Sequence, residues 1–276
     1  RERLPRPAFL RVHEPESDGE LPDGPRDPSP LQLYRFVMTP VPFLTRCRAD
    51  HGRVFTLRLA GMVPIVQFTE PEAIRTIFTE PGEKLHAGPA NAVLKPFLGP
   101  YSVLVLDGKE HMEQRRMLLP PFHGDRMRAY GDIMQKVTDE VVLRMPRGRA
   151  FEAHPFMQEI TLEVILRAVF GFEDGPELAE LRRVIVSALE SVSNPALMIG
   201  FLQVDFGARS PWGKFVRFMR SAHALIDAEI EKRRRFGTEG RHDILSMLVD
   251  ARHEDGSPMR NEEIRDELVT MLVAGH

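Results

Sequence analysis

The segment with the clearest chemical potential is Asp107–Arg116, which reads DGKEHMEQRR. His111 and Arg115 are four residues apart, so they share one face of any helix that includes them. Two cationic donors on one helix face can bind a divalent anion or a pair of carboxylates through charge-assisted hydrogen bonds. Taken alone, however, this spacing favours an ordinary solvated helix face.

A second informative segment is Leu268–His276, which reads LVTMLVAGH. It is apolar on every side, so we expect this end of a helix to lie in the protein interior. Gly275 weakens the helix and permits the close approach of something flat or bulky. Taken alone, it favours helix packing through a small residue, or a glycine cap at the helix end.

A third segment, Ser102–Leu106, is a short apolar run between a loop and the turn at Asp107 and Gly108. By itself it favours one ordinary buried, strand-like segment.

The elements that must position these segments are mainly helical. β-branched and aromatic residues on both sides of Gly61, within 53–68, predict one hairpin. Residues 1–30 are rich in proline and charge and predict an extended lead-in, while 86–101 predict a loop with room for one irregular turn. Helical spacing is found at 31–49 (interrupted by Pro40 and Pro42), 70–78, 109–119, 127–145, 155–170, 178–192, 215–235, 244–249 and from an N-cap near Asn261 onward.

Composition narrows the class of protein. The 276 residues are 42% hydrophobic and 28% charged with a net charge of −3, which suits a globular protein and disfavours nucleic acid as the main partner. The single cysteine, Cys47, excludes an intrachain disulfide and favours a reducing compartment. No apolar run approaches the roughly 20 residues of a membrane span. The N-terminus has no apolar signal-peptide core. We therefore expect a cytoplasmic protein.

Together and in this order, the three segments resemble the cytochrome P450 family. The resemblance runs from about Leu31 and includes HGRVF before the hairpin, TEPEAI at the next helix, Pro121-Phe122 and the final LVAGH. Its most specific parts are His-x-x-x-Arg and Ala-Gly-His. It implies the N-terminal portion of one mainly helical cytochrome P450 domain over residues 31–276, after the lead-in of 1–30.

The resemblance implies roles for the matched residues. His111 and Arg115 would pair with the haem propionates. Val103 and Leu104 would end the loop that closes over the haem and would also shape the substrate pocket. The distal face of the haem would be lined by Met271, Ala274 and Gly275, and Met271 and Ala274 would also line the pocket.

The sequence lacks counterparts of two features that are typical of the family. The family's axial cysteine and its Glu-x-x-Arg motif have no counterpart here, and Cys47, before the hairpin, is not expected to be a ligand. The acidic residue and threonine that follow Ala-Gly-His in the family would come after His276. We therefore expect no metal ligand in these residues, and expect the biological chain to continue.

The resemblance implies a haem monooxygenase that inserts one atom of O2 into an apolar substrate, which could be lipid-like, a terpenoid or a polyketide. Electrons would come from NAD(P)H through a reductase and a ferredoxin or flavodoxin. Within the apolar segments 86–104 and 176–215, candidate lining residues are Met198, Phe201 and Leu202.

A docking face for the redox partner could include Arg46, Arg48 and Arg128. The alternative function is a helical protein that binds an apolar ligand without chemistry. A helical DNA-binding regulator is disfavoured by the acidic charge balance.

Overall fold

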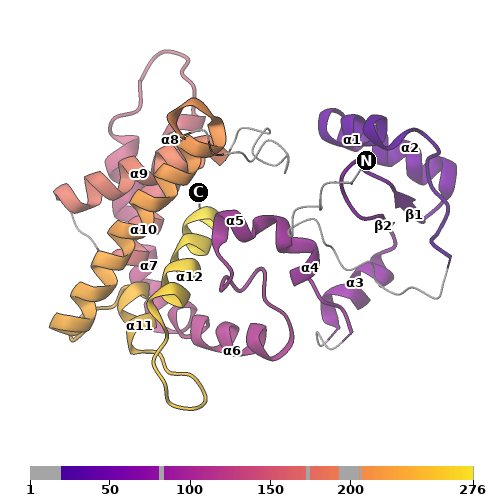
Figure 1. The fold of residues 1–276 in the computed structure, drawn as a ribbon. Coiled ribbons are helices and arrows are strands. Elements are labelled where there is room, and N and C mark those ends of the chain that lie inside the picture. The colour runs from indigo at the N-terminus through magenta and orange to yellow at the C-terminus, as the bar shows by residue number, and fades with distance from the viewer. Residues whose placement is uncertain (1–19, 81–83, 172–174, 193–204, 206, 276) are drawn as a thin grey trace. The chain divides into compact units, whose positions relative to one another are not determined.

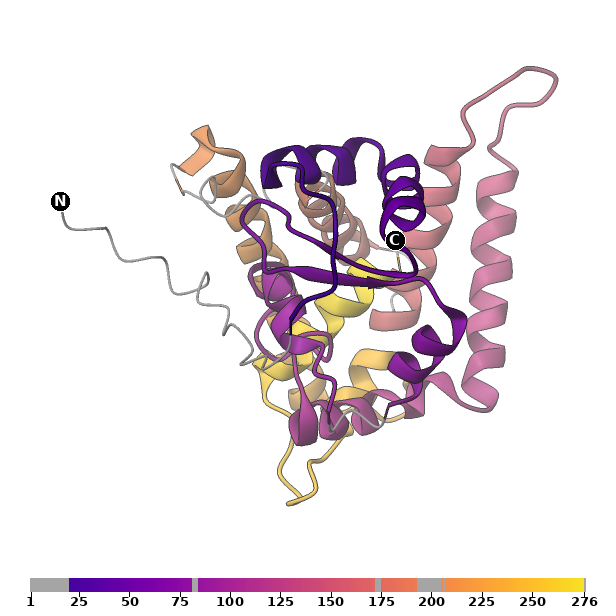
Figure 2. The same ribbon diagram turned by 90° about the vertical axis from the view of Figure 1, so that its right-hand side faces the viewer.

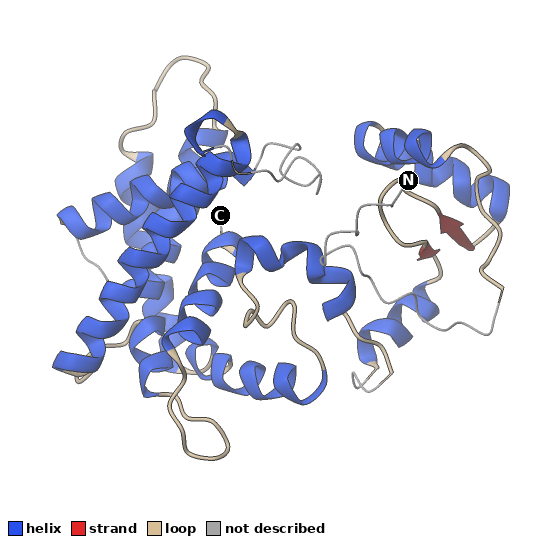
Figure 3. Ribbon diagram, in the orientation of Figure 1, coloured by secondary structure: helices blue, strands red, loops and turns tan. Residues whose placement is uncertain are grey.

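The structure is a computed structural model that describes residues 20–80, 84–171, 175–192, 205 and 207–275. The chain forms two compact units, Arg1–Pro89 and Ala90–His276, and each is described by itself. Figure 3 shows that helices dominate and that one small pair of strands is present in the described part of the chain.

The first unit holds helices α1 (Ser29–Met38) and α2 (Pro40–His51), strands β1 (Val54–Leu57) and β2 (Ile65–Phe68), and helix α3 (Pro71–Thr79). The strands are antiparallel, with Val54 opposite Phe68 and Leu57 opposite Ile65, which confirms the predicted hairpin. The predicted helical segment at 31–49 is two helices, because Pro40 lacks an N–H and begins a new helix. Residues 20–28 are not helical, whereas residues 1–19 of the predicted lead-in lie outside the described residues.

The second unit is built from helices. They are α4 (Gly88–Asn91, at the boundary of the units), α5 (Lys95–Leu98), α6 (Gly108–Leu118), α7 (Asp125–Val142), α8 (His154–Phe170), α9 (Pro176–Val192), α10 (Pro211–Phe236), α11 (Ile244–Asp250) and α12 (Asn261–Ala274). Single 3-10 turns occupy Ala92–Leu94, Pro120–Phe122 and Gly207–Arg209. Helices α7 and α8 run side by side and are joined by the loop at 143–153 (Figure 2).

Helix α12 lies at the centre of the second unit, where it packs against α5, α8, α10 and α11 (Figure 1). Its Ile264 and Leu268 are fully buried, as are Leu166 of α8 and Ile226 of α10. The apolar stripes predicted from the sequence therefore meet in one core, because each helix can bury its apolar face only against another.

Three local predictions were wrong. The segment 86–101 holds more than the one irregular turn expected, because α4, a 3-10 turn and α5 follow one another there, and Phe97 and Leu98 of α5 bury in the core. Ser102–Leu106 forms turns instead of a strand-like run. The N-cap of α12 is Arg260, whose backbone N–H donates to Glu263 at 2.8 Å, and Asn261 is the first helical residue.

The end of α12 is only partly interior. Leu268, Val269 and Leu272 are buried as expected, but Val273 is 42% exposed and Ala274 is also exposed. The described residues therefore leave one side of the last turn of α12 uncovered.

Candidate functional site

Helix α6 carries the predicted cationic pair. The helix starts after Asp107, at Gly108, and has Arg115 and Arg116 in its last turn, where positive charge interacts favourably with the helix dipole. The His111 side chain is half-buried and Arg115 is exposed. The Arg115 guanidinium makes no hydrogen bond or ion pair with any residue that the structure describes. Its five donors are therefore available to an anion.

The imidazole of His111 is held from one side by the loop that precedes α6. Its Nδ1 lies 3.0 Å from the carbonyl oxygen of Val103. Because a carbonyl oxygen can only accept, Nδ1 carries the proton in this contact. The other ring nitrogen, Nε2, can then donate a hydrogen bond only when the ring is the charged imidazolium.

Val103, in the loop before α6, is also held by α12. The Val103 N–H donates to Oε1 of Glu267 at 2.8 Å. The backbone of Val103 thus joins α6 to α12, with its carbonyl on His111 and its N–H on Glu267. This connection links the helix of the predicted cationic pair to the helix of the predicted distal segment.

Two further side chains of α12 form hydrogen bonds with the same loop. The N–H of Tyr101 donates to Oδ2 of Asp266 at 3.1 Å, and the hydroxyls of Ser102 and Thr270 hydrogen bond at 2.7 Å. Gly99 allows this approach, because a Cβ at that position would stand 2.1 Å from the carboxyl carbon of Asp266. The side chains of Asp266, Glu267 and Thr270 therefore clamp residues 101–103, and we call them the α12 clamp.

The clamp carboxyls are buried. Glu267 has no exposed surface, and burial raises its pKa to about 8, although the hydrogen bond from Val103 acts in the opposite direction. Burial also raises the pKa of Asp266. Among the described residues, Oε2 of Glu267 has no hydrogen-bond partner. Glu267 is therefore a neutral carboxylic acid at neutral pH.

The distal residues predicted from the sequence lie at the other end of α12. Met271 is half-buried against the core, and Ala274 is exposed. A Cβ at Gly275 would stand 2.8 Å from Cγ1 of Ile165, so the small residue permits close packing of α12 on α8. Leu104, at 43% exposure, projects from the clamped loop. Met198, Phe201 and Leu202 lie outside the described residues.

A histidine that the sequence did not single out makes a second connection between α6 and α12. His253, in the loop before α12, has Nδ1 at 3.1 Å from Glu113 of α6 and Nε2 at 3.1 Å from Glu263 of α12. Burial opposes the charged ring, but the hydrogen bonds to Glu263 and Glu113 outweigh it, so the pKa of His253 is raised. Both ring nitrogens face carboxyl oxygens, so both can donate a hydrogen bond only when the ring is protonated.

The α12 clamp was not predicted from the sequence, although one signal was present. Asp266 and Glu267 interrupt a helix whose neighbouring residues are apolar, and a charged pair on a buried helix needs partners. The partners could not be identified from the sequence, because they lie on a loop far away in the chain.

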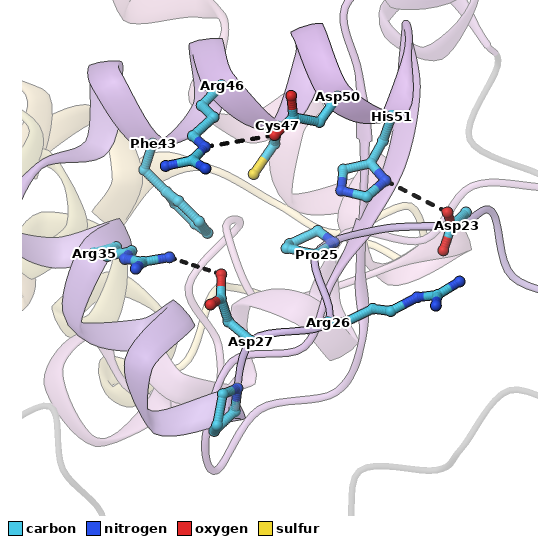
Figure 4. A pocket seen from close by; sticks show the side chains of 11 residues that line it. Asp23, Pro25, Arg26, Asp27, Arg35, Phe43, Arg46, Cys47, Asp50 and His51 are labelled. Carbon is cyan, nitrogen blue, oxygen red and sulfur yellow. Dashed lines mark hydrogen bonds and ion pairs between the residues drawn. The ribbon is translucent and has the colours of Figure 1, made fainter.

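Cys47 belongs to the first unit and not to this site. It is 3% exposed and packs with Phe43, Phe55, Leu57 and Leu59. It borders a cavity of about 680 Å³ (Figure 4), and burial is the main cause of the raised pKa of its thiol. Two ion pairs line the same cavity, Arg35 with Asp27 and Arg46 with Asp50, and Nδ1 of His51 lies 3.4 Å from Asp23. A protonated thiol between such pairs is a poor donor to a metal.

Comparison with known proteins gives one consistent result. The family model described as Cytochrome P450 matches residues 28–276. A protein of Mycobacterium tuberculosis that carries the name cytochrome P450 135B1 is 38% identical over 93% of this chain and 54% of its own length. Another from the same species, named cytochrome P450 138, is 36% identical over 93% of this chain and 57% of its own length. The chain thus spans about half the length of these curated relatives.

Two solved structures share the fold. Retinoic acid-bound cyanobacterial CYP120A1 has a TM-score of 0.72 at 20% identity, over 88% of this chain and 53% of that chain. The haem domain of cytochrome P450DA has a TM-score of 0.69 at 22% identity, over 93% of this chain and 56% of that chain. Among the described residues, no helix combines the length and apolar character needed to cross a membrane.

Proposed function

Because the chain belongs to the cytochrome P450 family, we propose that it is the N-terminal part of a haem-dependent monooxygenase. The proposed reaction inserts one atom of O2 into an apolar small molecule. The observation that carries the proposal is the Val103 connection, in which one loop residue contacts both His111 of α6 and Glu267 of α12. Val103 thereby connects the face of α6 that carries His111 and Arg115 to α12, which ends near the small residues Ala274 and Gly275.

The residues present fit one edge of a haem. A propionate is a carboxylate, and an exposed guanidinium without a described partner, as at Arg115, is the side chain best suited to bind it. His111 Nε2 would be the second donor, on the imidazolium. Cys47 does not fit the axial position, because it is buried among apolar side chains of the first unit as a protonated thiol.

When bound, haem supplies the activation of O2, while the protein supplies binding, orientation and a dry site. His111 and Arg115 would fix the orientation of the ring through its propionates. Val103 and Leu104 would close the loop over it, and Met271, Ala274 and Gly275 would leave space on the distal side. The α12 clamp would keep that loop in place, so that water is excluded from the pocket.

The substrate we propose is apolar, because the described candidates for the pocket, Val103, Leu104, Met271 and Ala274, are apolar. Retinoic acid is bound in one structural neighbour, cyanobacterial CYP120A1, and is a ligand of that protein. It supports only the general class of lipid-like, terpenoid or polyketide substrates. The proposed electron source is NAD(P)H, through a reductase and a ferredoxin or flavodoxin. Arg46 and Arg48 of the first unit and Arg128 of the second are each exposed, and each is proposed as a contact for the electron-transfer partner.

The test is the spectrum of the full-length protein after reduction and treatment with carbon monoxide. A Soret band at the position typical of thiolate-ligated haem supports the proposal. Absence of haem absorbance would instead support the alternative, a helical protein that binds an apolar ligand without chemistry. The matched variant is Arg115→Ala, which removes a side chain without described partners and is therefore expected to lower haem retention without lowering the stability of the fold.

A further inference from the structure

We propose that Glu267 is a positioning residue for His111, and that it acts through the backbone of Val103 to aim the imidazole at the haem propionate. This inference rests on the proposed function, since it assumes that His111 has a haem propionate to bind. It adds a role for a buried acid that neither the sequence motifs nor the direct haem contacts identify.

The geometry supports each step of this connection. Glu267 is fully buried on the central helix, so its carboxyl group is fixed by packing on every side. Oε1 accepts the Val103 N–H at 2.8 Å and fixes the backbone of that residue. The Val103 carbonyl then accepts from Nδ1 of His111 at 3.0 Å, which sets the rotation of the ring and keeps a proton on Nδ1. Nε2 is left as the ring nitrogen that can donate to an anion when the ring is an imidazolium.

The other members of the clamp hold the loop but do not lie on this path. Asp266 contacts Tyr101 and Thr270 contacts Ser102, and neither contacts the residue that accepts from His111. If Glu267 only stabilised the loop, its loss would resemble the loss of Thr270. If it positions His111, its loss should matter only while His111 is present.

The experiment measures the rate at which the full-length, haem-loaded protein loses haem to an excess of apomyoglobin. His111→Ala should accelerate the loss about tenfold, the usual effect of one hydrogen bond to a charged group. Glu267→Leu should give a similar acceleration, and the double variant should be no faster than His111→Ala alone. Glu267→Gln keeps an acceptor for the Val103 N–H and should restore a rate close to that of the wild type.

The control is Thr270→Val. In a double variant with His111→Ala, its fold-change in the rate of haem loss should multiply with that of His111→Ala, as expected for independent sites. A second readout avoids the haem-loss assay altogether. In the diamagnetic ferrous carbon monoxide complex, the Nδ1–H signal of the His111 imidazolium should show the hydrogen bond to Val103 in the wild type and in Glu267→Gln. In Glu267→Leu this signal should move toward that of a solvent-exposed N–H. This readout still applies if Glu267→Leu is too unstable for kinetics, because Glu267→Ser can replace it in the spectrum.

The outcomes separate this inference from the proposed function. If Glu267→Leu and His111→Ala act independently, or if the Nδ1–H signal of His111 is unchanged in Glu267→Leu, the positioning role is wrong even when Arg115→Ala still accelerates haem loss. If neither His111→Ala nor Arg115→Ala changes haem loss, the propionate contact itself is wrong.

Discussion

The hydroxyl groups of Ser102 and Thr270 hydrogen bond at 2.7 Å although the residues are 168 positions apart in the chain. Thr270 also bonds to the carbonyl oxygen of Asp266, one turn earlier in α12. Both side chains are buried, so neither hydroxyl can turn to bulk water instead. This contact fixes the loop to the central helix independently of the carboxyl groups.

Replacing Thr270 by valine should therefore lower the free energy of unfolding by about 1–2 kcal/mol, because the buried Ser102 hydroxyl loses its shorter hydrogen bond and keeps only the one from the Leu104 N–H at 3.3 Å. Denaturant unfolding measures the loss. The matched control is Thr161→Val on α8, an exposed threonine that also bonds to its own helix backbone, and it should change stability by less than about 0.5 kcal/mol. Equal effects would show that the hydroxyl pair contributes nothing.

Glu267 predicts a pH dependence with a definite sign. Its pKa is about 8 in the folded protein, against 4.5 for an ordinary glutamate, so the folded state binds more protons between these values. The free energy of unfolding should then fall as the pH rises from about 4.5 to 8, by up to about 1.4 kcal/mol per pH unit from this group.

Glu267→Gln removes this titration. The free energy of unfolding of the variant, relative to that of the wild type, should therefore rise as the pH rises from about 4.5 to 8. Above pH 8 this difference should stay constant. Denaturant titrations at several pH values measure this difference. A difference that does not depend on pH would mean that Glu267 is ionised in the folded protein.

His253 predicts a second pH effect, which removal of the residue can isolate. Its pKa is raised by Glu263 and Glu113, so its contribution to stability should be complete below pH 6.5, the ordinary value, and lost as the pH rises through the folded value. His253→Ala should thus cost about 1 kcal/mol or more at pH 5.5 and much less at pH 9. Equal costs at both pH values would show that the bridge does not depend on charge.

Gly99 should tolerate no side chain. It has φ 87° and ψ 165°, a region almost restricted to glycine, and a Cβ would collide with the Asp266 carboxyl group. Gly99→Ala should destabilise the protein by about 3 kcal/mol or more.

The control is Gly237, which has a similar backbone, φ 85° and ψ 171°, with no atom near the Cβ position. Gly237→Ala should therefore show the backbone cost alone, about 1–3 kcal/mol, and thermal unfolding of the two variants measures the difference.

The sequence predicted most helices of the second unit because their apolar stripes have the helical period, which is a local property. The hairpin was predicted from residue type around Gly61. The helical turn at Lys95–Leu98 was not, since its four residues are too few to show a period and are held by the burial of Phe97 and Leu98.

The candidate site was predictable only in part. The motif around His111 and Arg115 is contiguous, so it could be found in the sequence. The bonds from Tyr101 and Val103 to Asp266 and Glu267 join residues about 165 positions apart, and no local pattern encodes such a pairing.

The burial of Cys47 has a practical consequence for spectroscopy. It is the only cysteine in the 276 residues, it is 3% exposed, and its thiol stays protonated at neutral pH. Maleimide reagents attack exposed thiolates, so the folded chain should react with them slowly. A cysteine introduced at an exposed position such as Leu104 would then accept a fluorophore or spin label in preference to Cys47, and would report the motion of the clamped loop.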